Sequence, residues 1–370
     1  MEFLECQDPG ESSSMKILVI SLAGIGDTLF ATPLIHELRA NFPDATLDAL
    51  VLWGGAKQVL EGNPHLNNIF QRNLLRGERV AAMKLIASLR RGKYDVSINT
   101  YPQSRIHYRF VAGAIRARQR LSHTYHSANL LDRWLATKTI PQSYEMHSIE
   151  NNLALLGLLG KKPILPNHDY ELYLSDAERA WASEHVNGKA LKGARLMGVH
   201  VGSGGTKNLA LRRWPLNSYE ALFQKLQQTN PELRILLFGG PEEAEAHRLL
   251  MSEGQFANLM QPPTKSIRQA AALIARCDLF LSVDTSLMHV ASGMKVPHQI
   301  VIETPSWNQT IAPYRNPYTL VPNPAVNGKN LELYRYDGNG LRGTDQQLRD
   351  WMSSVSVDSV HQAVTGALEK

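Results

Sequence analysis

The 370-residue sequence has little cysteine, no long apolar run and no secretion signal. Its two cysteines, Cys6 and Cys277, are too few for a disulfide framework, which indicates a reducing compartment. No stretch of about 18 apolar residues occurs, so no transmembrane helix is expected. The N-terminus lacks the basic-then-apolar order of a signal peptide. We therefore expect a cytoplasmic protein, and contact with the inner face of the cytoplasmic membrane stays open.

Two common types of binding motif are also missing. In SLAGIGDTLFATP (residues 21–33), Gly24 and Gly26 are followed by Leu29, where a dinucleotide-binding motif has its third glycine. The next predicted strand ends at residues 51–53 without an acid for a ribose, so an NAD site is excluded. No D-x-D and no His/Cys/Asp cluster with metal-ligand spacing occurs. We therefore expect neither a cofactor nor a metal.

The composition, 43% hydrophobic and 20% charged, is typical of a folded globular protein. The length suits two domains of roughly 150 to 180 residues that share a cleft. We predict a disordered leader (1–14), two Rossmann-like domains (15–174 and 175–352) and a C-terminal helix (353–370). The boundary follows a proline-containing stretch that ends near Leu174.

Positive charge is concentrated in the first half of the sequence. Residues 71–140 hold fourteen Lys or Arg and only three acids, although the net charge of the whole chain is +5. This surplus is either an ordinary solvated face or a basic wall that attracts an anionic acceptor. Arg105 and Arg109 follow the predicted strand 95–99 and are the candidates for acceptor binding. No nucleic-acid motif accompanies the charge, so nucleic acid is not an expected partner.

Short apolar runs alternate with helical segments in both halves, which predicts parallel sheets with crossover helices. The fold class is therefore α/β, with two doubly wound sheets in tandem. The predicted strands are 16–21, 46–52, 68–70, 95–99, 118–122, 196–202, 234–240, 279–284 and 299–303. Two helix starts are also predicted, at Asn217 with Glu220 as a capping box and at Ser266. Ligands of such sheets bind at the carboxyl ends of the strands, where all the candidate residues lie.

Asp27 follows the first predicted strand and has two interpretations. Asp is a favoured N-cap, so Asp27 could simply begin the next helix. Thr32 and Pro33, however, offer that helix a cap and first residue of its own, which would leave Asp27 facing the cleft. Spacing alone leaves capping and catalysis both open.

The loop GSGGTKNLALRRWP (residues 202–215) suits a diphosphate, because small residues expose backbone N–H groups and cations follow. Its candidate donor-binding residues are Ser203, Gly204 and Arg212, with Lys207 and Arg213 as further cations; a plain surface loop is the alternative. Glu243, beside Glu242, is predicted in the first turn of a helix. There it could bind ribose hydroxyls, or it could simply stabilise the helix through its interaction with the helix dipole.

The segment VDTSLMHVASG (residues 283–293) is the most informative. A strand ends at Asp284, and a helix begins whose free N–H groups and hydroxyls point at one place, as an anion site requires. Asp284, Thr285, Ser286 and Leu287 are therefore donor-binding candidates. His289 lies on the helix face of Thr285, either packed or functional.

Taken together, GIGDTLFATP, GSGG with RRWP, FGGPEE, VDTSLMHVAS and IAPY resemble the lipopolysaccharide heptosyltransferase family, glycosyltransferase family nine. This resemblance implies the GT-B fold, with an acceptor-binding first domain and a nucleotide-sugar-binding second domain. It implies an inverting transfer that needs no metal. The expected donor is ADP-heptose, and the expected acceptor is a hydroxyl of a lipopolysaccharide-core or related anionic glycolipid.

The resemblance assigns roles residue by residue. It makes Asp27 the catalytic base, Arg212 the phosphate-binding cation and Glu243 the nucleotide-contacting acid, and it places the phosphates at residues 284–289. Arg212 stands where many members have Lys, Ser286 replaces a Gly, and ETPS (residues 303–306) replaces Gly-Pro-Thr. Two alternatives remain: a nucleotide-sugar epimerase of similar fold, which would need a further acid/base group, and a non-catalytic glycan-binding homologue.

Overall fold

The computed structural model describes residues 14–74, 79–125, 130–188, 191–203, 209–252, 256–326 and 343–369. Most of the predicted leader lies outside these residues. The first sheet contains β1 (Lys16–Ser21), β2 (Thr46–Val51), β3 (Asn68–Gln71), β4 (Val96–Asn99), β5 (Gln119–Thr124) and β6 (Lys138–Pro141). The second contains β7 (Leu196–His200), β8 (Arg234–Leu237), β9 (Leu259–Met260), β10 (Leu279–Ser282), β11 (His298–Ile302) and β12 (Tyr318–Val321).

The two sheets have the same topology. Their strand orders are β3-β2-β1-β4-β5-β6 and β12-β11-β10-β7-β8-β9, and every pairing is parallel. Counted within each half, both orders are 3-2-1-4-5-6, the doubly wound arrangement. The predicted fold class is therefore confirmed. In such sheets the order of the strands reverses next to the first strand, and ligands bind at that point. The loops after β1 and β7 therefore lie at the ligand-binding position.

All nine predicted strands are present, with ends that differ by a few residues. Three strands were not predicted, β6, β9 and β12, and each lies at the edge of its sheet. An edge strand buries less surface, and β6 (KTIP) has no fully buried residue. β9 has only two residues. The apolar signal that predicts central strands is therefore weak in these segments.

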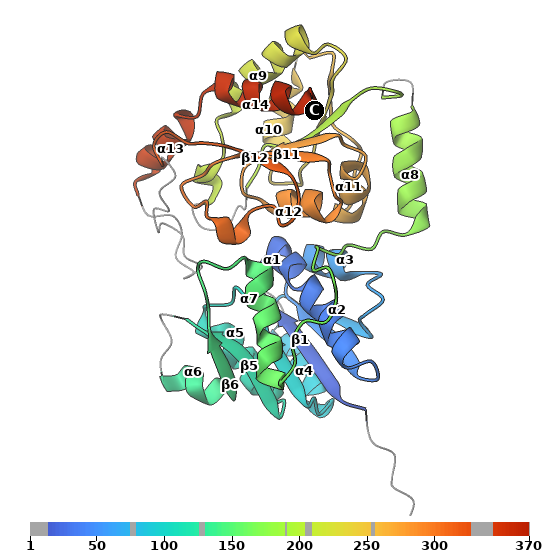
Figure 1. Ribbon diagram of the computed structural model, residues 1–370, viewed down its shortest axis with the longest axis vertical. Helices are drawn as coiled ribbons and strands as arrows, with labels where there is room; N and C mark the ends of the chain where they lie inside the picture. Colours follow the sequence, from blue (N-terminus) through green and yellow to red (C-terminus); the bar gives the residue numbers. More distant parts are fainter. Residues whose placement is uncertain are drawn as a thin grey trace, which may run out of the picture.

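Helices cover both sheets. The first half has α1 (Ile25–Phe30), α2 (Thr32–Asn41), α3 (Gly54–Leu60), α4 (Arg79–Arg91), α5 (Ile106–Ile115), α6 (Leu130–Leu135), α7 (Ser148–Ala154) and the 3₁₀ helix η1 (Leu155–Leu159). The second has α8 (Asp176–Asn187), η2 (Leu209–Arg212), α9 (Leu216–Thr229), α10 (Ala244–Leu250), α11 (Ile267–Ile274), α12 (Ser286–Gly293), η4 (Gln309–Ile311), α13 (Asp345–Ser353) and α14 (Val357–Leu368). Figure 1 shows the halves end to end, with α1 and α3 facing α12.

Two helix starts differ from each other in outcome. Ser266 caps α11 as predicted, because its hydroxyl accepts a hydrogen bond from Gln269 N. The predicted capping box at Asn217 is wrong, since α9 begins at Leu216 after Pro215 and has no side-chain cap. Proline fixes its own φ, which suits the entry to a helix without a cap.

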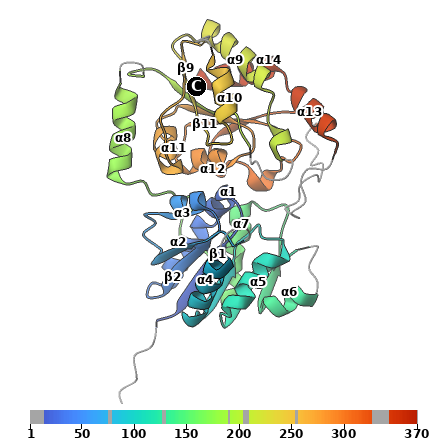
Figure 2. The same cartoon turned by 180° about the vertical axis from the view of Figure 1, so that it is seen from behind.

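The apolar core continues from one half into the other. One cluster of buried residues includes Ile17 and Leu29 of the first half together with Ala271, Phe280 and Val290 of the second. A second cluster lies between the second sheet and α9 and α14, and a third lies between the first sheet and α4 and α5. The shared cluster means that α1, α11 and α12 form the packed junction of the halves, which Figure 2 shows from behind.

Arg268 of α11 holds the halves together at one side of this junction. It is 9% exposed and binds both carboxylate oxygens of Glu178 at 2.6 and 2.7 Å. It also donates to the carbonyl oxygens of Gln58, Glu61 and Tyr173 at 3.0, 2.7 and 2.6 Å. One guanidinium therefore joins α3, the segment before α8, and the second half. The domain boundary near residue 174 stays a prediction.

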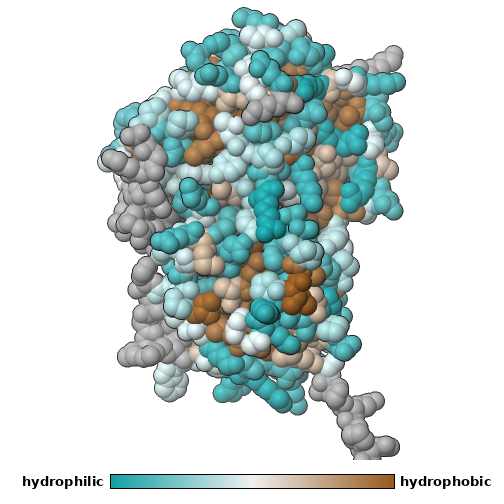
Figure 3. Space-filling model, viewed as in Figure 1, coloured by the Kyte–Doolittle hydropathy of each residue, from teal (hydrophilic) through white to brown (hydrophobic). Residues whose placement is uncertain are grey.

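Among the described helices, none is long and apolar enough to span a membrane. The face seen in Figure 3 is mainly hydrophilic, with separate hydrophobic patches on both halves. Five of the exposed large apolar side chains of the first half lie on α4, α5 and α6: Val80, Met83, Phe110, Leu131 and Trp134. These helices belong to the basic region 71–140.

Candidate active site

The helix after β1 and the helix after β10 meet at the junction. Gly26 of α1 lies against His289 of α12, so closely that a Cβ at position 26 would be 2.5 Å from His289 Cδ2. The rings of Phe30 and His289 meet edge to face, with centroids 4.6 Å apart. Glycine at position 26 thus permits the close approach that brings the N-terminal ends of both helices together.

Asp27 lies in the first turn of α1, at the third helical position. Its Oδ2 accepts a hydrogen bond of 2.7 Å from Gly24 N. The other oxygen, Oδ1, has no hydrogen bond among the residues that the structure describes. Both interpretations of Asp27 are therefore compatible with the structure, because one oxygen stabilises the start of α1 and the other is not engaged there. Thr32 does not cap α2; it is its first residue, and its hydroxyl donates to Leu29 O.

The surroundings of Asp27 favour a proton acceptor. The pKa of its carboxyl is raised from 3.8 to about 6, and burial is the largest cause. The Gly24 N–H lowers the pKa, the negative Asp284 raises it, and the positive Arg212 lowers it. A carboxylate with a pKa near 6 remains ionised at neutral pH and is a stronger base than an ordinary aspartate.

Arg212 and Asp284 form a buried ion pair next to α12. Nη1 of Arg212 lies 2.7 Å from Oδ2 of Asp284 and 3.1 Å from Oγ of Ser306. The two charged residues are 7% and 6% exposed. Burial raises the pKa of Asp284, and the charge of Arg212 and its hydrogen bond act in the opposite direction. The pair joins η2, the end of β10 and the loop after β11.

The guanidinium of Arg212 is not fully used by these partners. Its Nε is buried without a hydrogen-bond partner among the described residues, and so is Nε of the neighbouring Arg213. A buried donor without a partner is costly, which indicates that a ligand completes the site. Two adjacent donors of this kind suit the oxygens of a diphosphate.

The start of α12 adds further donors. Thr285 is the N-cap, and its Oγ1 accepts from Met288 N at 3.3 Å while lying 3.1 Å from Nδ1 of His200. The N–H groups of Ser286 and Leu287, in the first turn, have no intrahelical partner, and the helix dipole adds positive potential. Asp284, Thr285, Ser286 and Leu287 thus lie at the start of α12, and their role in donor binding stays a prediction.

His289 is packed at this point. It is 4% exposed, and its Nδ1 lies 3.2 Å from the hydroxyl of Tyr170. Burial, the larger cause, and the charge of Arg212 together lower the pKa of its imidazole to about 3, so the ring stays neutral. A neutral ring between Phe30 and Tyr170 positions α1 against α12.

Glu243 lies at the carboxyl ends of β7 and β8. It precedes α10, which begins at Ala244, so its predicted place in the first helical turn was wrong by one position. Its Oε2 accepts from Gly240 N at 2.9 Å, and its Oε1 lies 3.3 Å from Nη2 of Arg213. Burial raises the pKa of Glu243, but hydrogen bonds and positive charge from His200, Gly240 N and Arg213 outweigh burial, so the net pKa is lowered.

The loop after β7 is partly described. Ser203 is buried; its Oγ donates to Leu209 O at 2.8 Å, and its carbonyl accepts from Nη2 of Arg213 at 2.9 Å. Ser203 therefore supports the arginine-bearing turn. Gly204 and Lys207 lie outside the described residues.

The two candidate acceptor residues differ in environment. Arg105 is half-buried at the N-cap of α5. Arg109 is 2% exposed; its guanidinium donates to the carbonyls of Gln103 and Ser104 at 2.9 and 3.0 Å and lies 5.4 Å from the ring centre of Tyr125. Arg109 thus fixes the loop after β4. Its role in acceptor binding stays a prediction, and Arg109 would exert it by holding this loop in place.

Several residues at the junction were not predicted from the sequence. Tyr170, in the segment between the halves, contacts the rings of Phe30, His147, His289 and Tyr314. His147 Nε2 lies 3.0 Å from Ala312 O, and Ser148 donates to Thr310 O at 2.9 Å. The motif IAPY (residues 311–314) is visible in the sequence, but nothing there indicates which distant residues it contacts.

Comparison with known proteins places this geometry in a family. The family model described as glycosyltransferase family 9 (heptosyltransferase) matches residues 82–334, which is more than half of the chain. The chain belongs to glycosyltransferase family 9. The predicted resemblance is therefore confirmed, and with it glycosyltransferase activity of the family.

Individual relatives are more distant. The chain is 25% identical to lipopolysaccharide heptosyltransferase 3 of Escherichia coli over 284 residues, 74% of this chain and 78% of that protein. A glycosyltransferase family 9 structure from Veillonella parvula has a TM-score of 0.73 at 20% identity, covering 96% and 98% of the two chains. The E. coli heptosyltransferase WaaC with ADP-2-deoxy-2-fluoro heptose has a TM-score of 0.68 at 18% identity, covering 95% and 99%. These structural likenesses support the GT-B fold.

Proposed function

We propose that this family 9 glycosyltransferase transfers heptose from ADP-heptose to a hydroxyl of a lipopolysaccharide-core or related glycan, with inversion at the anomeric carbon. The observation that carries the proposal is the position of Asp27, a carboxylate with a raised pKa, opposite the cations and helix N-terminus around Arg212 and Asp284. The donor assignment draws on the relatives, one of which binds an ADP-heptose analogue.

In the proposed mechanism, Asp27 Oδ1 takes the proton of the acceptor hydroxyl as the oxygen attacks the anomeric carbon. The bond from that carbon to the phosphate oxygen breaks on the opposite face, and ADP leaves with the electron pair. Arg212, Arg213 and the first N–H groups of α12 stabilise the negative charge that develops on the diphosphate. Asp27 returns to its ionised state when its proton passes to solvent.

We further propose that the reaction needs no metal. Two arginines with unpartnered buried donors and a helix N-terminus together supply the positive potential that a divalent cation would supply elsewhere. Turnover should survive excess EDTA. If activity is lost in EDTA and returns with Mg²⁺ or Mn²⁺, this part of the proposal fails.

The acceptor is proposed to approach the first half. Residues 71–140 carry the surplus of positive charge, and exposed apolar side chains of α4, α5 and α6, including Met83, Phe110 and Trp134, lie in the same region. Such a surface suits an anionic glycolipid held in a membrane, because basic and apolar groups together favour the membrane interface.

Mass spectrometry after incubation with ADP-, UDP- and GDP-sugars and a lipid acceptor extract tests the proposal. We expect an acceptor that gains the mass of one heptose residue, only with ADP-heptose, and not with the Asp27→Asn variant. Conversion of the donor to an isomer without an acceptor product would instead indicate an epimerase. Binding without either product would indicate a non-catalytic homologue.

A further inference from the structure

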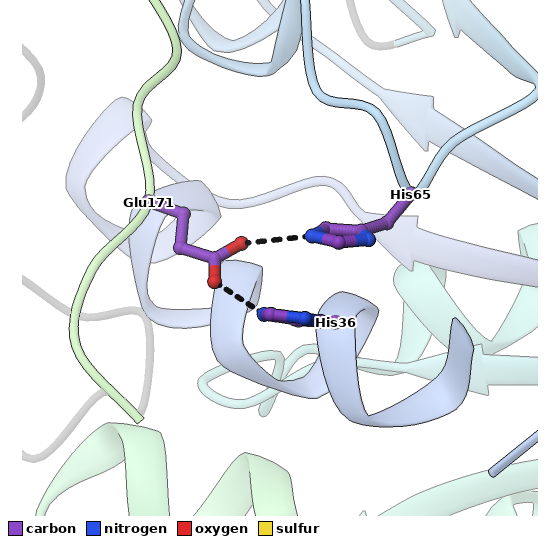
Figure 4. A group of neighbouring side chains, drawn as sticks. All are labelled: His36, His65 and Glu171. Carbon is purple, nitrogen blue, oxygen red and sulfur yellow. Dashed lines mark hydrogen bonds and ion pairs between the residues drawn. The ribbon is translucent and has the colours of Figure 1, made fainter. Parts of the chain in front are cut away.

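Three side chains outside the proposed active site converge on one point. His36 comes from α2, His65 from the loop between α3 and β3, and Glu171 from the segment between the halves. Figure 4 shows the Glu171 carboxylate reaching toward both rings. Nδ1 of His36 lies 2.6 Å from Oε1 of Glu171, and Nε2 of His65 lies 3.7 Å from Oε2. The three ligand-type atoms all lie within 4.8 Å of one another.

We propose that His36, His65 and Glu171 form a binding site for one divalent transition-metal ion of the Zn²⁺ type. Two imidazoles and one carboxylate are a ligand set that such ions take, with solvent completing the coordination. Metal–ligand bonds of about 2.0–2.2 Å in a tetrahedral site separate the ligand atoms by roughly 3.4 Å. Two separations in the cluster, 2.6 and 3.7 Å, lie on either side of this value, so the side chains must rotate but the backbone need not move.

The backbone that carries these ligands is already fixed. Arg39 donates twice to His65 O, at 3.2 and 3.1 Å, and also binds the side chain of Asn67. Glu171 N donates to Oγ1 of Thr32 at 3.0 Å. A site on fixed backbone loses little conformational freedom when an ion binds.

A neighbouring hydroxyl orients the carboxylate. The phenol of Tyr173 donates to Oε2 of Glu171 at 2.9 Å and lies 3.1 Å from Nε2 of His65. Partners of this kind hold a ligand in the orientation that a metal requires. Arg39 acts against the site, because its positive charge lies near His65 and weakens the binding of a cation there.

Binding requires two local changes. The rings of His36 and His65 are stacked with centroids 3.8 Å apart and an angle of 16° between their planes, so they must turn for their lone pairs to converge. Both ligand nitrogens also carry a proton, because Nδ1 of His36 donates to Glu171 and Nε2 of His65 donates to the Tyr173 hydroxyl, and each proton must move to the other ring nitrogen before an ion binds. The ion would then fasten the segment between the halves onto α2.

The cluster is not visible in the sequence, where no metal-ligand spacing was found, because His36 and Glu171 are 135 positions apart. It shares no residue with the group around Asp27, Arg212 and Asp284. A metal here would therefore stabilise the fold without taking part in the transfer, which remains compatible with turnover in EDTA.

The test uses the full chain without a histidine tag, stripped with EDTA and dialysed, and titrated with Zn²⁺ alone in a calorimeter. We expect one saturable site, a rise in Tm of a few degrees at about 100-fold excess over Kd, and visible absorption when Co²⁺ replaces Zn²⁺. His36→Ala and Glu171→Gln should each lose this binding. His185→Ala, which changes a histidine of α8 outside the cluster, should bind as the wild type does.

Circular dichroism of the metal-free variants checks that they remain folded. Absence of saturable binding in the wild type, or unchanged binding in folded Glu171→Gln, would show that the cluster is an ordinary hydrogen-bonded group. This readout does not involve turnover, so it is independent of the experiments on the proposed function.

Discussion

Nη1 of Arg212 donates a hydrogen bond of 2.7 Å to Oδ2 of Asp284, and both residues are almost completely buried. The pair leaves Arg212 with an unused donor, Nε, while Asp284 contributes negative charge that raises the pKa of Asp27. The proposed phosphate site and the proposed base are thus coupled electrostatically across the junction of the two halves. Changes on either side should be measurable on the other.

Asp27→Asn should lower kcat by roughly 10² to 10⁴, the usual contribution of a positioned general base. Asparagine keeps an oxygen that can accept the hydrogen bond from Gly24 N, so α1 and donor affinity should be nearly unchanged. Steady-state kinetics and calorimetry with ADP measure both quantities. A variant with wild-type turnover would remove Asp27 from its role.

The pH dependence of kcat/KM should show an acidic limb with a pKa of about 6. Burial raises the pKa of Asp27, so the proton acceptor is lost as the pH falls through 6 and not through the ordinary value near 4. Below this pKa the rate should fall about tenfold per pH unit, and above it the rate should be constant. A limb near pH 4, with the protein folded throughout, contradicts the assignment.

Arg212→Lys should weaken ADP binding roughly tenfold, the effect of losing one charge-assisted hydrogen bond. Lysine keeps the charge beside Asp284 but lacks the planar fork whose Nε is unused in the structure. Arg276→Lys, at an exposed position after α11, is the matched control and should bind ADP normally. Equal affinity in both variants would mean that Arg212 serves the fold alone.

Gly26→Ala should reduce both stability and activity, because the new Cβ would lie 2.5 Å from Cδ2 of His289. His289 is buried between rings and cannot move away without shifting α12, and overpacking of this kind costs about 1–3 kcal/mol. Gly157→Ala is the control, since its Cβ would meet no atom within 4 Å. Thermal unfolding of the two variants measures the difference, and equal Tm values would show that α1 and α12 are loosely packed.

Arg105→Ser and Arg109→Ser should have different effects. Arg109 donates to two carbonyls of the loop after β4, so its loss should lower Tm. Arg105→Ser should raise the acceptor KM, more at low salt than at high salt, because the contribution is electrostatic. Poor nucleotide binding by Arg105→Ser with an unchanged acceptor KM would contradict the proposed division between the halves.

Central strands and loop residues could be predicted from the sequence, whereas contacts between distant segments could not. β1 and β10 are continuous apolar runs, so the positions of Asp27 and Asp284 at their ends followed directly. Edge strands such as β6 lack that signal. Tyr170 and Glu171 lie in an alternating segment that belongs to neither a helix nor a strand, and the sequence does not show which distant residues they contact.

The contacts of Arg268 determine which residues at this junction must change together during evolution. Three of its four partners, at positions 58, 61 and 173, are backbone carbonyls, which every amino acid supplies. Only Glu178 is recognised through its side chain. We expect Arg268 and Glu178 to change together among close homologues, so that this contact between the halves is inherited as a single pair of residues, whereas the other three contacts do not depend on which side chain the partner position carries.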